Sequence, residues 1–78
     1  MSKFAEMLMK LRKERGLSQN GLSRSIEIPK TTISNWEIRG SFPSYEAINK
    51  LADFFEVSGD YLLGREDEFG NPIPKQKR

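Results

Sequence analysis

Two short stretches in the first half of the chain constrain its fold most. The first covers residues 19–26, and the second starts near Pro29 and ends at Gly40, so that only about three residues join them. Leu22 and Ile26 lie four positions apart, which places them on one face of a helix. Helices this short are marginal on their own in water. The two stretches must therefore pack on a shared core, and their spacing predicts a helix-turn-helix unit.

The second stretch favours two different structures. Its β-branched residues, Ile28, Thr31, Thr32 and Ile33, favour a strand, whereas Pro29 is well suited to the first turn of a helix. Ile33 and Trp36 are three positions apart and would share one helical face. We predict a helix over about 29–38 that is held by this apolar face and exposes the polar residues Lys30, Thr31, Ser34 and Asn35.

Three further stretches have helical spacing. The first follows Ser2, a candidate N-cap, ends at Gly16, and has an apolar stripe of Phe4, Met7, Leu8 and Leu11. The next starts at Ser44, and its stripe is Ala47, Ile48, Leu51, Ala52 and Phe55. Ser58 is expected to cap a last helix over 59–63, which Gly64 ends. The sequence thus predicts an all-α, compact five-helix bundle over 1–64, followed by a flexible tail or linker over 65–78.

Composition excludes several kinds of chemistry. The chain of 78 residues contains no Cys and no His, which rules out disulfides, Cys/His zinc sites, thiol catalysis and imidazole acid–base catalysis. We therefore expect no catalytic residue, no metal and no cofactor. No run approaches the roughly 18 apolar residues of a membrane span, and the N-terminus does not have the pattern of a signal peptide. A net charge of +2 by itself indicates no partner.

The order and spacing of three groups of residues resemble a known family. These groups are "LR…GLSQ", "TIS.WE" and "PS…I.KLA..F.VS.DYLLG", and they run from about Leu8 to Gly64. Together they are similar to the phage-repressor or Cro-type (lambda repressor-like) helix-turn-helix domain. The resemblance implies binding to a double-stranded DNA operator, with the helix at about 29–38 in the major groove.

The resemblance also implies roles for individual residues. Base readout is expected from Pro29, Lys30, Thr31, Ser34 and Asn35. Phosphate contacts are expected from Ser18, Gln19, Arg39, Ser41 and Tyr45. Arg12 and Glu37 match an ion pair that ties the first helix to the end of the third. For the outward residues of 29–38, a plain solvated helix surface is the alternative interpretation.

The sequence departs from the family pattern at several positions. Glu27 stands where a Gly is usual, and a left-handed backbone there would cost on the order of 1 kcal/mol. Arg39 also occupies the place of a Gly, which here follows as Gly40. Gly21 replaces a common helix former and should weaken its helix by roughly 1 kcal/mol.

The expected function is that of a transcriptional repressor, phage or bacterial, that binds a two-fold operator as a homodimer. The predicted dimer interface is Gly59, Tyr61, Leu62 and Leu63. The alternative is an antitoxin-type module that holds a partner protein and represses its own promoter. Phe69 and Ile73 in the tail would then contact that partner, or a further C-terminal domain. The expected location is the cytosol of a bacterium or phage host, near the nucleoid.

Overall fold

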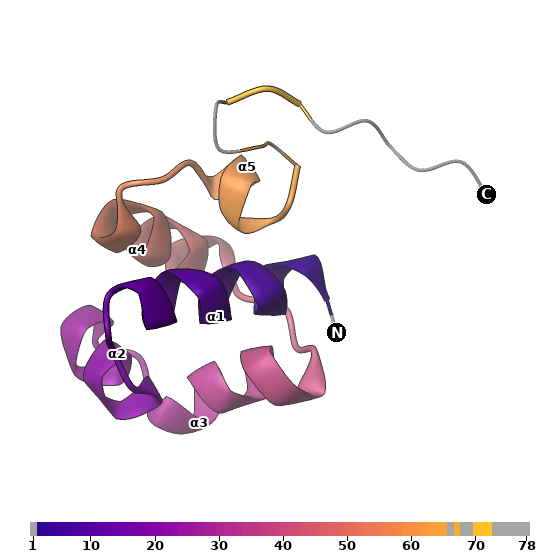
Figure 1. Cartoon of the computed structure of the whole chain (residues 1–78). Coiled ribbons are helices and arrows are strands. Elements are labelled where there is room, and N and C mark those ends of the chain that lie inside the picture. The colour runs from indigo at the N-terminus through magenta and orange to yellow at the C-terminus, as the bar shows by residue number, and fades with distance from the viewer. Residues whose placement is uncertain (1, 66, 68–69, 73–78) are drawn as a thin grey trace.

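The computed structural model describes residues 2–65, 67 and 70–72. Helix α1 crosses the middle of the domain, with α2 and α3 on one side and α4 and α5 on the other (Figure 1). The bounds are Lys3–Glu14 for α1, Gln19–Ile26 for α2, Lys30–Ser34 for α3, Asn35–Arg39 for the π-helical turn η1, Tyr45–Phe55 for α4 and Gly59–Leu62 for α5. The predicted all-α bundle of five helices is confirmed, and η1 continues α3 without a break.

Serine caps begin four of the helices. In each, the serine hydroxyl accepts a hydrogen bond from the backbone N–H three residues later, at 2.9–3.1 Å. These serines are Ser2, Ser18, Ser44 and Ser58. Each cap satisfies an N–H that would otherwise have no partner within its helix. This is why helix starts were readable from the sequence.

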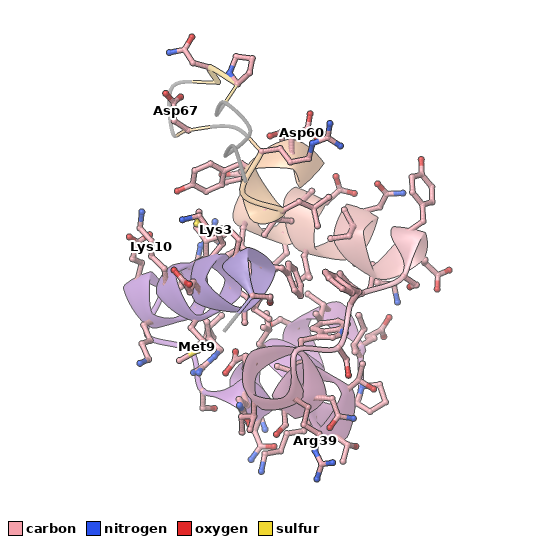
Figure 2. The ribbon with its side chains drawn as sticks, turned by 90° about the vertical axis from the view of Figure 1, so that its right-hand side faces the viewer. Lys3, Met9, Lys10, Arg39, Asp60 and Asp67 are labelled. Atoms are coloured by element: carbon pink, nitrogen blue, oxygen red, sulfur yellow. The ribbon has the colours of Figure 1, made fainter. Side chains whose placement is uncertain are left out.

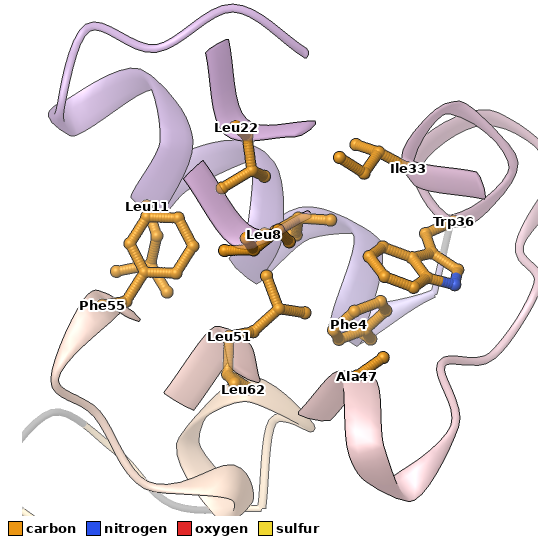
Figure 3. Packing of buried hydrophobic residues seen from close by; sticks show 11 residues of the cluster. Phe4, Leu8, Leu11, Leu22, Ile33, Trp36, Ala47, Leu51, Phe55 and Leu62 are labelled. Atoms are coloured by element: carbon orange, nitrogen blue, oxygen red, sulfur yellow. The ribbon is translucent and has the colours of Figure 1, made fainter. Parts of the chain in front are cut away.

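The core lies where all the helices meet (Figure 3). Leu8 of α1, Leu22 of α2, Ile33 of α3 and Leu51 of α4 are fully buried. Trp36 is also in the core, and its ring meets the edge of Phe4 at 5.7 Å between centroids and 74° between planes. The predicted helix at 29–38 is therefore held from behind, as its spacing indicated, and its β-branched residues do not form a strand.

Two helices end in a left-handed residue that is not glycine. Glu27 has φ 58° and ψ 45°. The left-handed backbone that the family pattern implies at this position is therefore present. The N–H groups of Glu27 and Ile28 both donate to the carbonyl of Ser23. Glu56 repeats this arrangement at the end of α4, with φ 57°. Nothing in its local sequence had indicated this, because no glycine pattern marks the position.

The third helix ends in a wider turn than the sequence predicted. Over Asn35–Arg39 the backbone is π-helical, and the N–H groups of Gly40 and Ser41 both donate to the carbonyl of Asn35. Gly40 then takes a left-handed φ of 74°. Both Trp36 and Glu37 are buried by this turn, and the next residues, Ile38 and Arg39, are exposed.

The remaining described residues follow α5. Leu63 is the C-cap of α5, so the helix is one residue shorter than predicted. Asp67 accepts a hydrogen bond from the backbone N–H of Asn71 at 2.9 Å. Phe69 and Ile73, the predicted partner contacts of the tail, lie outside the described residues. No helix within the described ranges has the length and apolarity needed to cross a membrane.

Candidate nucleic-acid interface

A buried ion pair fixes η1, the continuation of α3, against α1. The guanidinium of Arg12 binds both carboxylate oxygens of Glu37, with Nε–Oε2 and Nη2–Oε1 distances of 2.9 Å. The Glu37 side chain is only 3% exposed and that of Arg12 12%. The remaining terminal nitrogen of Arg12, Nη1, donates to the carbonyl of Leu17 at 2.9 Å. Three segments, α1, the residues before α2, and η1, therefore meet at one charged cluster.

Gln19 completes this cluster. Its amide Nε2 donates to Oε1 of Glu37 at 2.9 Å. The carboxylate of Glu37 thus accepts three hydrogen bonds, two from a charged donor. Within the described residues, no buried side-chain nitrogen or oxygen lacks a partner. A fully satisfied cluster of this kind holds the start of α2 and the end of α3 in one relative orientation.

The outward face of α3 carries the predicted base-reading residues. Pro29, Lys30, Thr31 and Asn35 are exposed, and Ser34 is half-buried. The buried side of α3 and η1 consists of Ile33, Trp36 and Glu37. The structure therefore brings all five predicted residues to one continuous surface, with Ser34 at its edge.

Sequence reasoning missed one residue on this face. Ile38 is 74% exposed and lies in η1, three residues after the exposed Asn35. The sequence does not mark Ile38 as exposed, because an isoleucine two residues after Trp36 is as apolar as the core residues before it. Only the structure shows that the core side ends at Glu37.

The predicted phosphate-binding residues lie around the ends of the helix pair. Arg39, Ser41 and Tyr45 are exposed, Tyr45 to 83%. Figure 2 shows Arg39 projecting from the end of the molecule that lies opposite α5. Ser18 is exposed, and its hydroxyl oxygen accepts from Gly21, which leaves the hydroxyl hydrogen as a donor. Gln19 differs from the others, because it is half-buried and directs one amide N–H inward to Glu37.

The predicted dimer residues do not all lie on the surface. Leu62 is fully buried in the core, so it cannot present its side chain to a second copy, and its place in the predicted interface is corrected. Leu63 is 36% exposed. Tyr61 is half-buried, with its hydroxyl 3.5 Å from Nζ of Lys10, and Gly59 lies close to the side chain of Ile48. One of the two adjacent leucines had to face inward, and packing selected Leu62.

The described part of the chain holds no group of three His, Cys, Asp or Glu side chains that would bind a metal ion. Its candidate interface is instead made of neutral donors and acceptors with two cations, Lys30 and Arg39, on the α3–η1 surface. Such a surface suits hydrogen bonding to a flat, polar partner rather than group-transfer chemistry.

Comparison with known proteins gives consistent results. A family model described as helix-turn-helix matches residues 8–62. The HTH-type transcriptional activator BcrR of Enterococcus faecalis is 34% identical over 64 residues, which are 82% of this chain and 31% of BcrR. YobD, an uncharacterized HTH-type transcriptional regulator of Bacillus subtilis, is 32% identical over 75 residues, 96% of this chain and 64% of YobD.

A solved structure supports the same relationship. The crystal structure of a transcriptional regulator from Listeria innocua matches with a TM-score of 0.73 and 31% sequence identity, over 83% of this chain and 61% of that one. The chain spans between 31% and 64% of the length of the curated relatives named above.

Proposed function

The chain belongs to the Cro/C1-type helix-turn-helix family, whose members are DNA-binding regulators and not enzymes, and on this premise we propose that it is a sequence-specific transcriptional regulator of double-stranded DNA. The observation that carries the proposal is the outward face of α3. This face is polar and exposed, and a buried ion pair and a tryptophan hold it rigidly from behind. A rigid helix with donors and acceptors on its outer side is what readout of the major groove requires.

Each polar residue of the face has a base edge that it suits. Lys30 donates to O6 and N7 of guanine, and Asn35 pairs with N6 and N7 of adenine. Thr31 offers a hydroxyl, and a methyl group that packs on the methyl group of thymine. Pro29 and Ser34 lie at the edges of this surface. We therefore expect a half-site in which guanine and adenine on the contacted strand carry most of the discrimination.

Phosphate contacts flank the reading helix in this proposal. Ser18 and Gln19 at the start of α2 bind one phosphate, through the serine hydroxyl and the second amide N–H of the glutamine. Arg39, Ser41 and Tyr45 bind the backbone on the other side. Contacts of this kind set the position of the protein on DNA without reading sequence.

We further propose that two copies bind a two-fold operator as a repressor. A single small domain with a few base contacts gains limited affinity, and two copies on half-sites about 34 Å apart overcome this. Leu63, Tyr61 and Gly59 are the proposed contact with the second copy. The regulator would act in the bacterial or phage-host cytosol, because the operator DNA is there.

Selection of bound sequences from a random duplex library tests the proposal. The wild-type chain is expected to enrich one two-fold motif. Asn35→Ala should lose the preference at one base pair of each half-site, whereas Arg39→Gln should weaken binding to all sequences alike. Arg39 is a cleaner phosphate variant than Gln19, because Gln19 also binds Glu37. Failure of the wild-type chain to enrich any motif, together with recovery of a protein partner through residues 65–78, would favour the antitoxin-type alternative.

A further inference from the structure

Ile38 is an apolar residue on an otherwise polar surface. Its side chain is 74% exposed, although it lies two residues after the buried Trp36. It belongs to η1, whose wider turn buries Trp36 and Glu37 and leaves Ile38 outward. An isolated exposed isoleucine would need no explanation by itself. Ile38, however, lies close in the chain to Thr31 and Asn35, two of the proposed base-reading residues.

The position of Ile38 relative to the proposed base readers is well defined. Thr31, Asn35 and Ile38 form an exposed stripe along α3 and η1, whereas Ile33, Trp36 and Glu37 of the same two elements are buried. A DNA duplex that Thr31 and Asn35 contact through its major groove must therefore pass close to Ile38. Ile38 lies three residues after Asn35, toward the C-terminal end of η1.

Chemistry limits what Ile38 can recognise. Its side chain has no hydrogen-bond donor or acceptor, so it cannot read the polar edges of guanine, adenine or cytosine. Thymine alone presents an apolar group, the C5 methyl, in the major groove. Resting on the proposed function, we propose that Ile38 is a specificity-determining residue that reads thymine by packing on this methyl group. Asn35 and Ile38 would then read an adenine and a thymine in the same half-site.

Removal of the methyl group from the DNA tests this contact directly. In the selected operator, each thymine is replaced in turn by deoxyuridine, which keeps every hydrogen-bonding group and lacks only the methyl. Binding is measured by fluorescence anisotropy for the wild-type chain and for Ile38→Ala. The wild-type chain should lose roughly fourfold in affinity at two thymines of each half-site, one that packs on Thr31 and one that packs on Ile38, the value expected for one methyl group moved from an apolar contact into water. Ile38→Ala should lose the response at the second of these thymines only.

Phe42 provides a matched control. It is also apolar and 78% exposed, but it lies in the loop after η1 and outside the stripe. Phe42→Ala should therefore keep the wild-type pattern of responses to deoxyuridine. Ile38→Val, which retains a branched apolar side chain, should keep the response at the same thymine. Melting curves should show that all three variants fold, because the altered side chains contribute little to the core.

The outcomes separate the two proposals. If every thymine responds equally in the wild-type chain and in Ile38→Ala, Ile38 does not read thymine, although sequence-specific DNA binding still stands. If the wild-type chain selects no sequence at all, the proposed function fails and this inference fails with it.

Discussion

At the scale of single residues, the carboxylate of Glu37 is buried and held by three hydrogen bonds. It is paired with the guanidinium of Arg12 and accepts a further hydrogen bond from the amide of Gln19. Taking two charges out of water is costly, so such a pair contributes more to a defined arrangement than to net stability. The loss of one partner is different, because it leaves the other charge buried and unpaired.

We predict that Glu37→Ala destabilises the domain by about 3–5 kcal/mol, because Arg12 is then left uncompensated. The free energy of unfolding from urea titrations followed by circular dichroism measures this loss. Glu46→Ala, at an exposed position in α4, should change it by less than about 0.5 kcal/mol. The double variant Arg12→Met/Glu37→Met should regain much of the loss. If Glu37→Ala and Glu46→Ala have the same free energy of unfolding, the ion pair does not contribute to the stability of the domain.

Glu27 offers a second residue-scale prediction. Its left-handed backbone suits glycine, which has no Cβ to clash. Glu27→Gly should therefore raise the free energy of unfolding by about 1 kcal/mol. Glu6→Gly, at an exposed position in the first turn of α1, should lower it by a similar amount, because glycine is a poor helix former. If Glu27→Gly and Glu6→Gly lower the free energy of unfolding equally, the left-handed backbone at position 27 does not favour glycine.

At the scale of elements, helix starts depend on short-range hydrogen bonds. Ser44 caps α4, the helix that supplies Ala47, Leu51 and Phe55 to the core. Ser44→Ala should cost about 1 kcal/mol in the free energy of unfolding, since the N–H of Ala47 loses its acceptor. Ser44→Asp should retain most of the stability, because aspartate also caps. Ser41→Ala, in the exposed loop before it, serves as the control and should be close to neutral. A loss in Ser41→Ala equal to that in Ser44→Ala would contradict the capping role.

At the scale of the whole molecule, the proposed DNA interface contains few positively charged side chains. Lys30 and Arg39 are on the α3–η1 surface, and two copies would bring four such charges to the operator. The slope of log K against log salt concentration should then be about −4. Arg39→Gln should reduce its magnitude by about 2 for a dimer. Lys10→Gln, on a part of α1 away from Arg39 in Figure 2, should leave the slope unchanged. A slope near zero would exclude phosphate binding as a main source of affinity.

The position of α5 also constrains any dimer on DNA. Figures 1 and 2 show α3 and α5 at opposite ends of the molecule. In a dimer on DNA, both α3 helices must face the same side. The two copies must therefore meet along a side of α5, and not through the end of α5 that points away from α3. Contact through that end would direct the two reading helices away from each other.

The dimer proposal is tested by operator binding of a variant and by sedimentation of the wild-type chain. Leu63→Lys should weaken binding to a palindromic operator at least about tenfold, because one buried apolar contact per copy is replaced by a charge. Binding to an isolated half-site should be unchanged. A wild-type chain that sediments as a strict monomer, both free and on a palindromic operator, would rule out the dimer.

The sequence by itself determined which segments are helices and where most of them begin. Periodicity and serine caps act over three or four residues, so they are readable without tertiary structure. The apolar face of Ile33 and Trp36 also identified the outward residues Lys30, Thr31 and Asn35 correctly as exposed. The ion pair between Arg12 and Glu37 came only from family resemblance, since 25 residues separate its partners.

Tertiary structure alone decided the rest. Whether Leu62 or Leu63 faced inward depended on the packing of α5 against the core, and local spacing is the same for both. The left-handed Glu56 and the π-helical turn over Asn35–Arg39 arise where helices must end to fit their neighbours. That turn also leaves Ile38 exposed, which makes it a candidate reader of thymine. Local patterns specify elements, whereas the competition of many side chains for one small core specifies which of them remain outside.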